Sequence, residues 1–246
     1  MEKMVYLERV DSTNRYARML ASEGAPHGTL VIANEQTGGR GRRGRSWISP
    51  AGEGIFMSLI LRPQCAPEKT PMLSLQTALA VARAIHTVTG LEAKIKWPND
   101  IVVCGKKVCG MLLEMDFSEG RLQSVVAGVG INVHQTVFPD EIVRTASSLD
   151  LLSGRRIPRK AVIDAFLREF EQTQKLMEDS GLFMDTYRAY SATLGQKVQV
   201  IALGETYTGT ALEVTDSGSL IVLNEEGEHR EVLAADVSVR GLMGYV

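Results

Sequence analysis

Two short runs of buried-type residues, 29–34 (TLVIAN) and 55–61 (IFMSLIL), constrain the fold of this chain most strongly. Each run is typical of a strand that is covered on both faces, so helices or further strands must pack over it. Between the runs lie about twenty residues that are dense in glycine and arginine and have no apolar period. Structureless stretches of this size in compact domains are usually functional or disordered. The chain therefore combines a buried sheet with one long loop that needs an explanation.

The segments around this loop predict a mixture of helices and hairpins. Residues 72–89 repeat apolar side chains with the 3.6-residue period of a helix packed on a sheet, and this helix should end at Gly90. Residues 161–177 return to the same spacing. The predicted strands are 5–10, 101–103, 108–114 and 123–133, with residues 104–107 as a hairpin turn. This alternation favours a mixed α/β (α+β) layer domain over a regular βαβ repeat.

After Gly195 the pattern changes to short strands separated by turn signals, as in a small antiparallel barrel of the SH3-like kind. A length of 246 residues is comfortable for two domains. We therefore expect one domain at 1–192 and a C-terminal SH3-like β-barrel at 193–246.

The net charge is small, but the charges are unevenly placed. The whole chain has 27 Lys and Arg against 29 Asp and Glu, a formal net charge of −2. From Gly195 to the end there are three cations and eight anions, Asp236 among them, a net of 3 − 8 = −5. A protein that clamps long nucleic acid through a broad basic face is therefore not expected.

The hydropathy pattern and the cysteine spacing argue against membrane proteins, secreted proteins and disulfide or zinc frameworks. The chain shows no apolar run that fits a signal peptide or a membrane span, so we expect a cytoplasmic protein. Cys65, Cys104 and Cys109 lack C-x-x-C spacing, and the four histidines are scattered. This arrangement favours neither a disulfide framework nor a zinc site.

The loop at 38–47, GGRGRRGRSW, has the chemistry of an anion-binding segment. Its glycines let successive N–H groups converge on an anion, and its guanidinium groups bind phosphate or carboxylate oxygens in pairs. Four like charges within six residues repel one another, so we expect the loop to be mobile until an anionic ligand orders it. On the loop alone, an alternative is an arginine-rich loop that grips RNA or DNA without sequence preference.

Three further segments have both a chemical and a structural interpretation. Asn99 and Asp100 follow a Pro turn, where an amide and a carboxylate suit Mg²⁺ and phosphate, or simply form an Asx turn. Lys106-Lys107 at the predicted hairpin turn is either functional or a solvated tip. Residues 11–14 (DSTN) are typical of a helix cap, and Gln36 of a surface amide.

Gly128-Val129-Gly130-Ile131-Asn132 lies inside a predicted strand. Its glycines permit a close backbone approach, which would leave the amide of Asn132 able to read an adenine edge. Each of these segments is weak evidence by itself.

Taken together and in this order, the five motifs resemble those of the biotin protein ligases. The motifs are DSTN at 11–14, EQTGGRGRRGRSW at 35–47, KWPND at 96–100, GKKVCG at 105–110 and GVGIN at 128–132. The resemblance extends over the chain, since this family also ends in a small SH3-like domain.

The resemblance implies an ATP-dependent ligase. Such enzymes join biotin to ATP as biotinyl-5′-AMP, with Mg²⁺, and pass the acyl group to one lysine of the biotin carboxyl-carrier domain of a carboxylase. Some members also carry an N-terminal DNA-binding module, but only ten residues precede DSTN here, so we expect no DNA partner. Family members often dimerise, which makes a homodimer possible.

The resemblance also implies roles for single residues. The biotin-binding residues would be Ser12, Thr13, Asn14, Gln36, Arg40, Gly41, Arg42 and Lys107. The ATP-binding residues would be Arg42, Arg43, Arg45, Trp47, Asn99, Asp100, Asn132 and Arg240. Lys107, Arg42 and Asp100 would be catalytic, and Asp100 would also hold the metal.

Two other functions stay open. A lipoate-type ligase of related fold would also use the Asn-Asp and Lys residues, although the GRGRRGRSW loop favours biotin. A nucleic-acid-binding protein using the arginine loop belongs to a different class. It is disfavoured by the net charge and by the lack of an aromatic-rich platform in the sequence.

Overall fold

The computed structural model describes residues 3–63, 69–202, 205–234 and 238–241, so Cys65 and Asp236 lie outside the described residues. The chain forms two compact units. The first unit consists of Met1–Pro67, Val108–Phe138 and Ser147–Arg159. The second consists of Glu68–Lys107, Pro139–Ala146 and Lys160–Val246.

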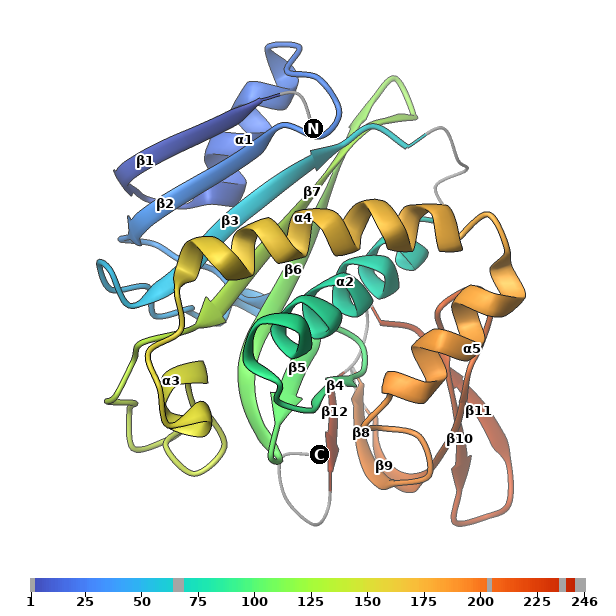
Figure 1. The fold of residues 1–246 in the computed structure, drawn as a ribbon. Helices are drawn as coiled ribbons and strands as arrows, with labels where there is room; N and C mark the ends of the chain where they lie inside the picture. Colours follow the sequence, from blue (N-terminus) through green and yellow to red (C-terminus); the bar gives the residue numbers. More distant parts are fainter. Residues whose placement is uncertain (1–2, 64–68, 203–204, 235–237, 242–246) are drawn as a thin grey trace. The chain divides into compact units, whose positions relative to one another are not determined.

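The first unit is built on a mixed sheet with the strand order β1-β2-β3-β7-β6 (Figure 1). The bounds are β1 Met4–Val10, β2 Leu30–Gln36, β3 Gly54–Leu61, β7 Arg121–Asn132 and β6 Lys106–Ser118, the last belonging to this unit from Val108 on. Strands β1 and β2 are parallel, and the other neighbours are antiparallel. The buried-type runs that the sequence predicts as strands are β2 and β3, whose apolar residues are almost fully buried.

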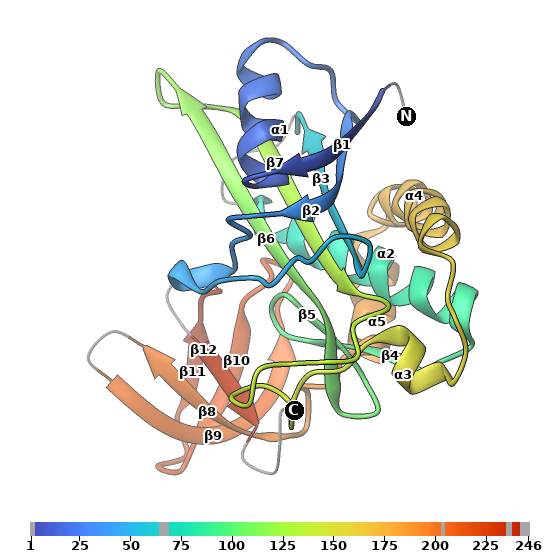
Figure 2. The ribbon, with the colours of Figure 1, turned by 90° about the vertical axis from the view of Figure 1, so that its left-hand side faces the viewer.

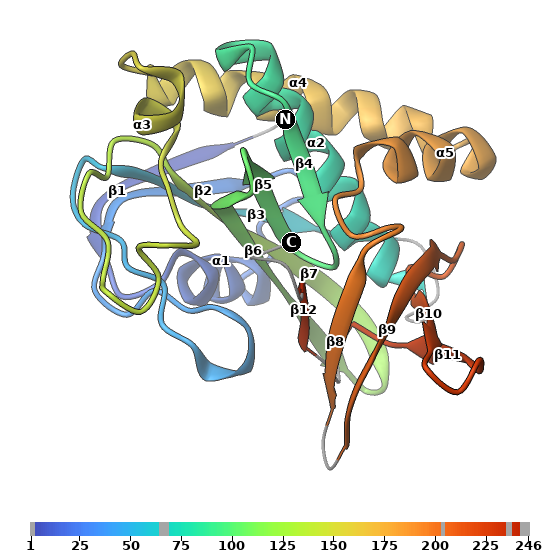
Figure 3. The same ribbon diagram turned by 90° about the horizontal axis from the view of Figure 1, so that it is seen from below.

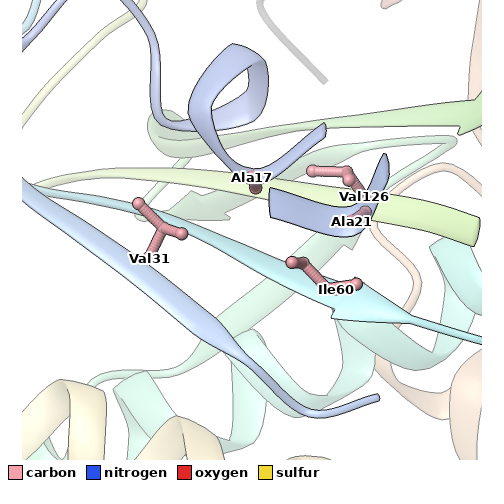
Figure 4. Close-up of a cluster of buried hydrophobic side chains, with 5 residues drawn as sticks. All are labelled: Ala17, Ala21, Val31, Ile60 and Val126. Atoms are coloured by element: carbon pink, nitrogen blue, oxygen red, sulfur yellow. The ribbon is translucent and has the colours of Figure 1, made fainter. Parts of the chain in front are cut away.

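Helix α1 (Thr13–Ser22) covers one face of this sheet (Figure 2). Its buried residues Ala17 and Ala21 pack against Val31 of β2, Ile60 of β3 and Val126 of β7 (Figure 4). Alanine is small enough to let the helix backbone approach the strands closely, and burying the branched side chains removes apolar area from water at about 25 cal/mol per Å². This packing fixes the first turn of α1 above the central strands. Helix α3 (Leu149–Ser153) and the short 3₁₀ turn η1 (Arg42–Gly44), which the sequence did not predict, complete the unit.

The second unit contains the longest helix, α2 (Pro71–Thr89). It ends at Gly90 with φ of 76°, a left-handed conformation that favours glycine, so the predicted end of the helix is confirmed. Helix α2 packs on the hairpin of β4 (Ala93–Lys96) and β5 (Asp100–Val103). Two more helices follow: α4 (Arg159–Leu176), in this unit from Lys160 on, and α5 (Ser180–Tyr190), which the sequence did not predict.

The C-terminal part of the second unit is a five-stranded antiparallel sheet (Figure 3). Its strands are β8 Lys197–Ala202, β9 Glu205–Val214, β10 Leu220–Asn224, β11 His229–Val232 and β12 Ser238–Gly241, in the order β11-β10-β9-β8-β12. The succession of short antiparallel strands that the sequence predicts after Gly195 is therefore confirmed. Among the described residues, no helix is both long and apolar enough to cross a membrane.

Candidate functional site

The first turn of α1 buries three polar side chains. Ser12, Thr13 and Asn14 are 3%, 3% and 6% exposed. Ser12 occupies the N-cap position, but its side chain makes no capping hydrogen bond to the first turn. Instead, the backbone N–H of Thr13 donates to Gln36 Oε1 at 2.8 Å, and the Thr13 hydroxyl donates to the same oxygen at 3.0 Å. The interpretation of DSTN as no more than a cap therefore does not account for these residues.

Gln36 connects the start of α1 to the arginine loop. Its Nε2 donates to Ser49 Oγ at 2.9 Å, and the Ser49 hydroxyl donates to the carbonyl of Trp47 at 3.1 Å. Residues 35–39 and 46–50 line a pocket of ≈ 360 Å³ on this side of the first unit. Gln36 is therefore a structural member of the pocket wall rather than an isolated surface amide.

Two glycines of β7 form the floor beneath these side chains. A Cβ on Gly128 would lie 2.1 Å from Asn14 Oδ1, and a Cβ on Gly130 would lie 2.5 Å from Trp47 Nε1. Real Cβ atoms do not come so close to other atoms, so only glycine fits at either position. The close backbone approach that the sequence predicts for GVGIN is confirmed, and it is Asn14 and Trp47 that make the approach.

The arginine loop has more local structure than its sequence predicts. Isolated bridges join Arg40 to Ser46 and Gln36 to Ser49, and the N–H of Gly41 donates to the carbonyl of Arg45 at 2.7 Å. The turn η1 contains Arg43 in a left-handed conformation, with φ 57° and ψ 37°, which is strained for a residue with a side chain. Figure 2 shows this light-blue segment extending away from β2.

The side chains of this loop are mostly accessible. Arg40, Arg43 and Arg45 are exposed, whereas Arg42 is half-buried. Three guanidinium groups are therefore open to solvent at a loop whose backbone is already folded back on itself.

Lys107 and Asp100 form an ion pair in the second unit, with Lys107 Nζ 2.7 Å from Asp100 Oδ1. The side chains are 24% and 14% exposed, so water screens this pair less than a surface pair. Asp100 is the first residue of β5 and lies opposite Lys96 of β4, as a hairpin turn at 97–99 requires.

One expectation about this hairpin region is wrong. Lys106 and Lys107 belong to β6 and not to the turn, which consists of Cys104 and Gly105 with φ values of 50° and 71°. Two left-handed residues in succession make the tight connection that the right-handed twist of strands prefers, so two residues suffice and the strand resumes at Lys106. The backbone N–H of Lys107 then donates to the carbonyl of Thr145 at 2.8 Å. Lys107 is thus held by a strand and is no solvated tip.

The remaining predicted site residues occupy different environments. Asn99 is half-buried in the β4–β5 turn. Asn132 is 6% exposed, and its Nδ2 donates to the carbonyl of Ser147 at 3.1 Å, which holds the segment before α3. Arg240 is an exposed residue of β12.

Two residues at the site escaped the motif analysis. Ser58 is fully buried and contacts Thr13 and Asn14. Glu114 accepts a hydrogen bond from Asn14 Nδ2 at 2.8 Å. A signal existed for Ser58, because it is the one polar residue in the run IFMSLIL.

Arg18 lies beside Glu114, with Arg18 Nη1 3.7 Å from Glu114 Oε1. A hydrogen bond to Asp116 raises the pKa of Arg18, so the guanidinium keeps its charge next to Glu114.

The described residues contain no cluster of three or more His, Cys, Asp or Glu side chains that could hold a metal ion by themselves. Mg²⁺ commonly needs only one or two carboxylates, because substrate phosphates and water supply its other oxygen ligands. A single carboxylate such as that of Asp100 therefore fits Mg²⁺ carried by a nucleotide. It does not fit an all-protein cage.

Comparison with known proteins gives consistent matches along the chain. Residues 6–132 match the biotin/lipoate A/B protein ligase family, and residues 193–240 match the biotin protein ligase C-terminal domain. The bifunctional ligase/repressor BirA of Bacillus spizizenii is 40% identical over 242 residues, which cover 97% of this chain and 74% of that protein.

Two further relatives match over nearly their whole length. The biotin–[acetyl-CoA-carboxylase] ligase of Paracoccus denitrificans is 33% identical over 237 residues, covering 93% of this chain and 97% of that protein. Among solved structures, the biotin protein ligase from Aquifex aeolicus in complex with biotin and ATP superimposes with a TM-score of 0.83 at 30% identity, covering 98% and 100% of the two chains.

Proposed function

The chain belongs to the biotin/lipoate A/B protein ligase family, and on this premise we propose that it activates biotin with ATP as biotinyl-5′-AMP and transfers the acyl group to one lysine of a carrier domain. The observation that carries the proposal is the set of three buried polar side chains, Ser12, Thr13 and Asn14. Thr13 is hydrogen-bonded to the half-buried Gln36, and the Asn14 amide lies against Gly128 of β7. Such a set recognises a small polar ring, because buried donors and acceptors reject ligands that leave them unpaired. The name of the Paracoccus relative supports biotin and a carboxylase as the partner.

We assign the biotin contacts to eight residues. They are Ser12, Thr13, Asn14, Gln36, Arg40, Gly41, Arg42 and Lys107. The ATP contacts are Arg42, Arg43, Arg45, Trp47, Asn99, Asp100, Asn132 and Arg240. We also propose that the sequence divides functionally at 192/193, which the start of the matched C-terminal domain at 193 supports.

The first chemical step joins two anions. A carboxylate oxygen of biotin attacks the α-phosphorus, a new P–O bond forms, and the bond to the β-phosphate breaks to release pyrophosphate. Fixed positive charge and alignment serve this step better than a strong base. Arg42 and Lys107 supply that charge, and the ion pair to Asp100 holds Lys107 Nζ in place before the ligand arrives. Mg²⁺, when bound, neutralises phosphate charge, and Asp100 is the residue that would hold it.

The second step transfers the acyl group. The carrier lysine nitrogen attacks the acyl carbon, the C–O bond to AMP breaks, and the nitrogen loses a proton. We assign the assistance with this proton to Asp100. Closure of the loop 38–47 over the mixed anhydride excludes water until the lysine docks.

Transfer of labelled biotin to a biotin carboxyl-carrier domain tests the proposal directly. Calorimetry separates it from the alternatives, since biotin binding that strengthens with ATP supports it. Octanoate or lipoate binding in place of biotin would identify a lipoate-type ligase, and salt-sensitive oligonucleotide binding a nucleic-acid-binding protein.

Two variants test the assigned charges. Arg42→Ala and Lys107→Ala should each lower pyrophosphate release at least about tenfold, because each removes a charge-assisted contact worth roughly 1.5 to 3 kcal/mol. Arg121→Ala and Lys106→Ala are matched controls, since Arg121 is an exposed arginine at the β6–β7 turn and Lys106 precedes Lys107 on the same strand and so points to its opposite face. Unchanged release in both test variants would contradict the assignment.

The resemblance to the family also implies a homodimer as one oligomeric state of the chain, and sedimentation with and without ligands tests it.

A further inference from the structure

Ser58 is a fully buried hydroxyl in the middle of β3, with no exposed surface. Its Oγ lies 2.6 Å from Asn14 Oδ1 and 2.8 Å from Thr13 Oγ1. Opposite Ser58 in the sheet is Gly128, whose missing side chain leaves room for the Asn14 amide. Ser58 therefore contacts two of the residues to which we assign biotin binding without lining the pocket itself.

The orientations of both amides in this cluster are determined by backbone groups. Asn14 Nδ2 donates to the carbonyl of Leu112 at 3.1 Å and to Glu114 Oε2, so the atom next to Ser58 is the acceptor Oδ1. Gln36 accepts a hydrogen bond from the backbone N–H of Thr13, so the atom next to the Thr13 hydroxyl is the acceptor Oε1. Turning either amide over would set donor against donor or acceptor against acceptor.

A proton count shows that the cluster lacks one donor. Three oxygen–oxygen contacts connect Asn14 to Ser58, Ser58 to Thr13, and Thr13 to Gln36. The amide oxygens carry no proton, and the two hydroxyl groups carry one each. Two protons cannot serve three contacts, so one acceptor pair in this buried cluster has no hydrogen between its oxygens. A ligand N–H would relieve this shortage, whereas a ligand carbonyl or hydrocarbon would not.

We propose that Ser58 is a positioning residue that sets the donor and acceptor pattern of the biotin site. Its shortest contact commits its single proton to Asn14, and the Thr13 proton goes to Gln36, which leaves the Thr13 oxygen as an acceptor for an N–H group of a ureido ring. This inference rests on the proposed function. It makes Ser58 a determinant of biotin affinity that acts through Asn14 and Thr13 and has no role in ATP binding.

Steady-state pyrophosphate release by the full chain tests the proposal, with biotin and dethiobiotin as ligands. Dethiobiotin keeps the ureido N–H groups but lacks the sulfur-containing ring. Ser58→Ala should raise KM for both ligands about tenfold, the loss expected for one buried hydrogen bond, while KM for ATP and kcat stay within about twofold. Ser58→Cys, which keeps a weak donor of similar size, should give an intermediate KM.

A matched control is Ser124→Ala, which makes the same truncation at a buried serine near the other end of β7 and should change neither KM. An unchanged KM for biotin in Ser58→Ala would overturn the proposal. A parallel rise in KM for biotin and ATP would also overturn it, because it would indicate a general loss of structure. A loss for biotin alone, without dethiobiotin, would place Ser58 on the sulfur side and overturn it too. If the unaltered chain released no pyrophosphate with biotin, the proposed function itself would fail, which is a distinguishable result.

Discussion

At the scale of single residues, burial distinguishes the polar side chains that form the candidate site from those that only cap a helix or lie on the surface. Ser12 to Asn14 have the composition of a cap, yet the hydrogen bonds of Thr13 and Asn14 reach Gln36 on β2 and Leu112 and Glu114 on β6. Such side chains lose rotamer freedom on folding, so the contacts must compensate for that entropy. The glycines of β7 matter for the same reason, since they leave the space in which these contacts form.

Gly128→Ala should lower biotin affinity at least about tenfold. The new Cβ would lie 2.1 Å from Asn14 Oδ1, so the amide must leave its position, and overpacking of this kind costs roughly 1 to 3 kcal/mol. Calorimetry and urea unfolding measure the two effects. Gly181→Ala is the control, because a Cβ there meets only Asp179 Oδ1 at 3.5 Å. Wild-type affinity in Gly128→Ala would show that Asn14 is not held as described.

Tyr187→Phe should stabilise the protein by about 1 kcal/mol at neutral pH. The Tyr187 hydroxyl is fully buried and, among the described residues, has no hydrogen-bond partner. Burial raises the pKa of Tyr187, so the folded state holds the neutral phenol. The unfolded chain begins to lose this proton near pH 10, whereas the folded chain keeps it. The free energy of unfolding of the unaltered protein therefore falls as the pH rises above about 10. Urea unfolding at pH 7 and pH 11 should therefore show a larger gain for Tyr187→Phe at pH 11.

At the scale of elements, the arginine loop and the tight turns are the segments in which local chemistry decides the structure. The backbone of 38–47 is folded back by its own bridges, but most of its guanidinium groups are exposed. Repulsion among these charges weakens with salt and is removed by an anionic ligand. The loop should therefore respond to ligands more than any strand around it.

Limited proteolysis checks this response. We expect trypsin to cut the free protein between Gly38 and Ser49, and biotin plus ATP to protect that segment, because ligand oxygens pair the exposed guanidinium groups. Cleavage at Arg121, in the distant β6–β7 turn, is an internal control that ligands should leave unchanged. Equal cleavage of the loop with and without ligands would contradict the idea of ordering.

The β6–β7 turn offers a prediction that does not involve the site. Glu119 and Gly120 connect the strands with φ values of 50° and 73°, and asparagine tolerates this conformation better than glutamate. Glu119→Asn should therefore stabilise the protein by about 0.5 kcal/mol. Gly120→Ala should destabilise it by about 1 kcal/mol through backbone strain alone, since no atom lies within 4 Å of the added Cβ. Changes in Tm of opposite sign for the two variants in thermal unfolding would confirm the conformation of this turn.

At the scale of the whole molecule, charge and composition define the class of ligand. The segment after Gly195 carries a net charge of −5, and the other residues therefore carry −2 − (−5) = +3. A positive charge concentrated in one loop suits a compact anion better than a long polyanion. The match to known ligases over nearly the whole chain agrees with this interpretation.

Ligand binding should raise the thermal stability of the entire chain. A ligand at one hundred times its Kd stabilises the folded state by about 2.7 kcal/mol. For a chain of this size, that free energy corresponds to a rise in Tm of roughly 5 to 10 °C. We expect this rise with biotin plus ATP, because together they form an adenylate that keeps the contacts of both ligands. Biotin alone or ATP alone should give a smaller rise in Tm. Differential scanning calorimetry measures it, with lipoate plus ATP as the comparison. A larger rise with lipoate would favour the lipoate-type alternative.

The sequence by itself determined the five motifs and several of the helices and strands, because apolar period and glycine act over a few positions. The end of α2 at Gly90, the buried strands β2 and β3, and the short C-terminal strands all follow from such local patterns. Only the tertiary structure decided that Lys107 lies on a strand paired with Asp100, and that Ser58 adjoins Thr13 and Asn14. The Ser58 contacts join residues far apart in the chain, and the Lys107 contact spans a turn whose length the sequence did not define. A local pattern specifies which face of an element is buried but not which side chain it meets.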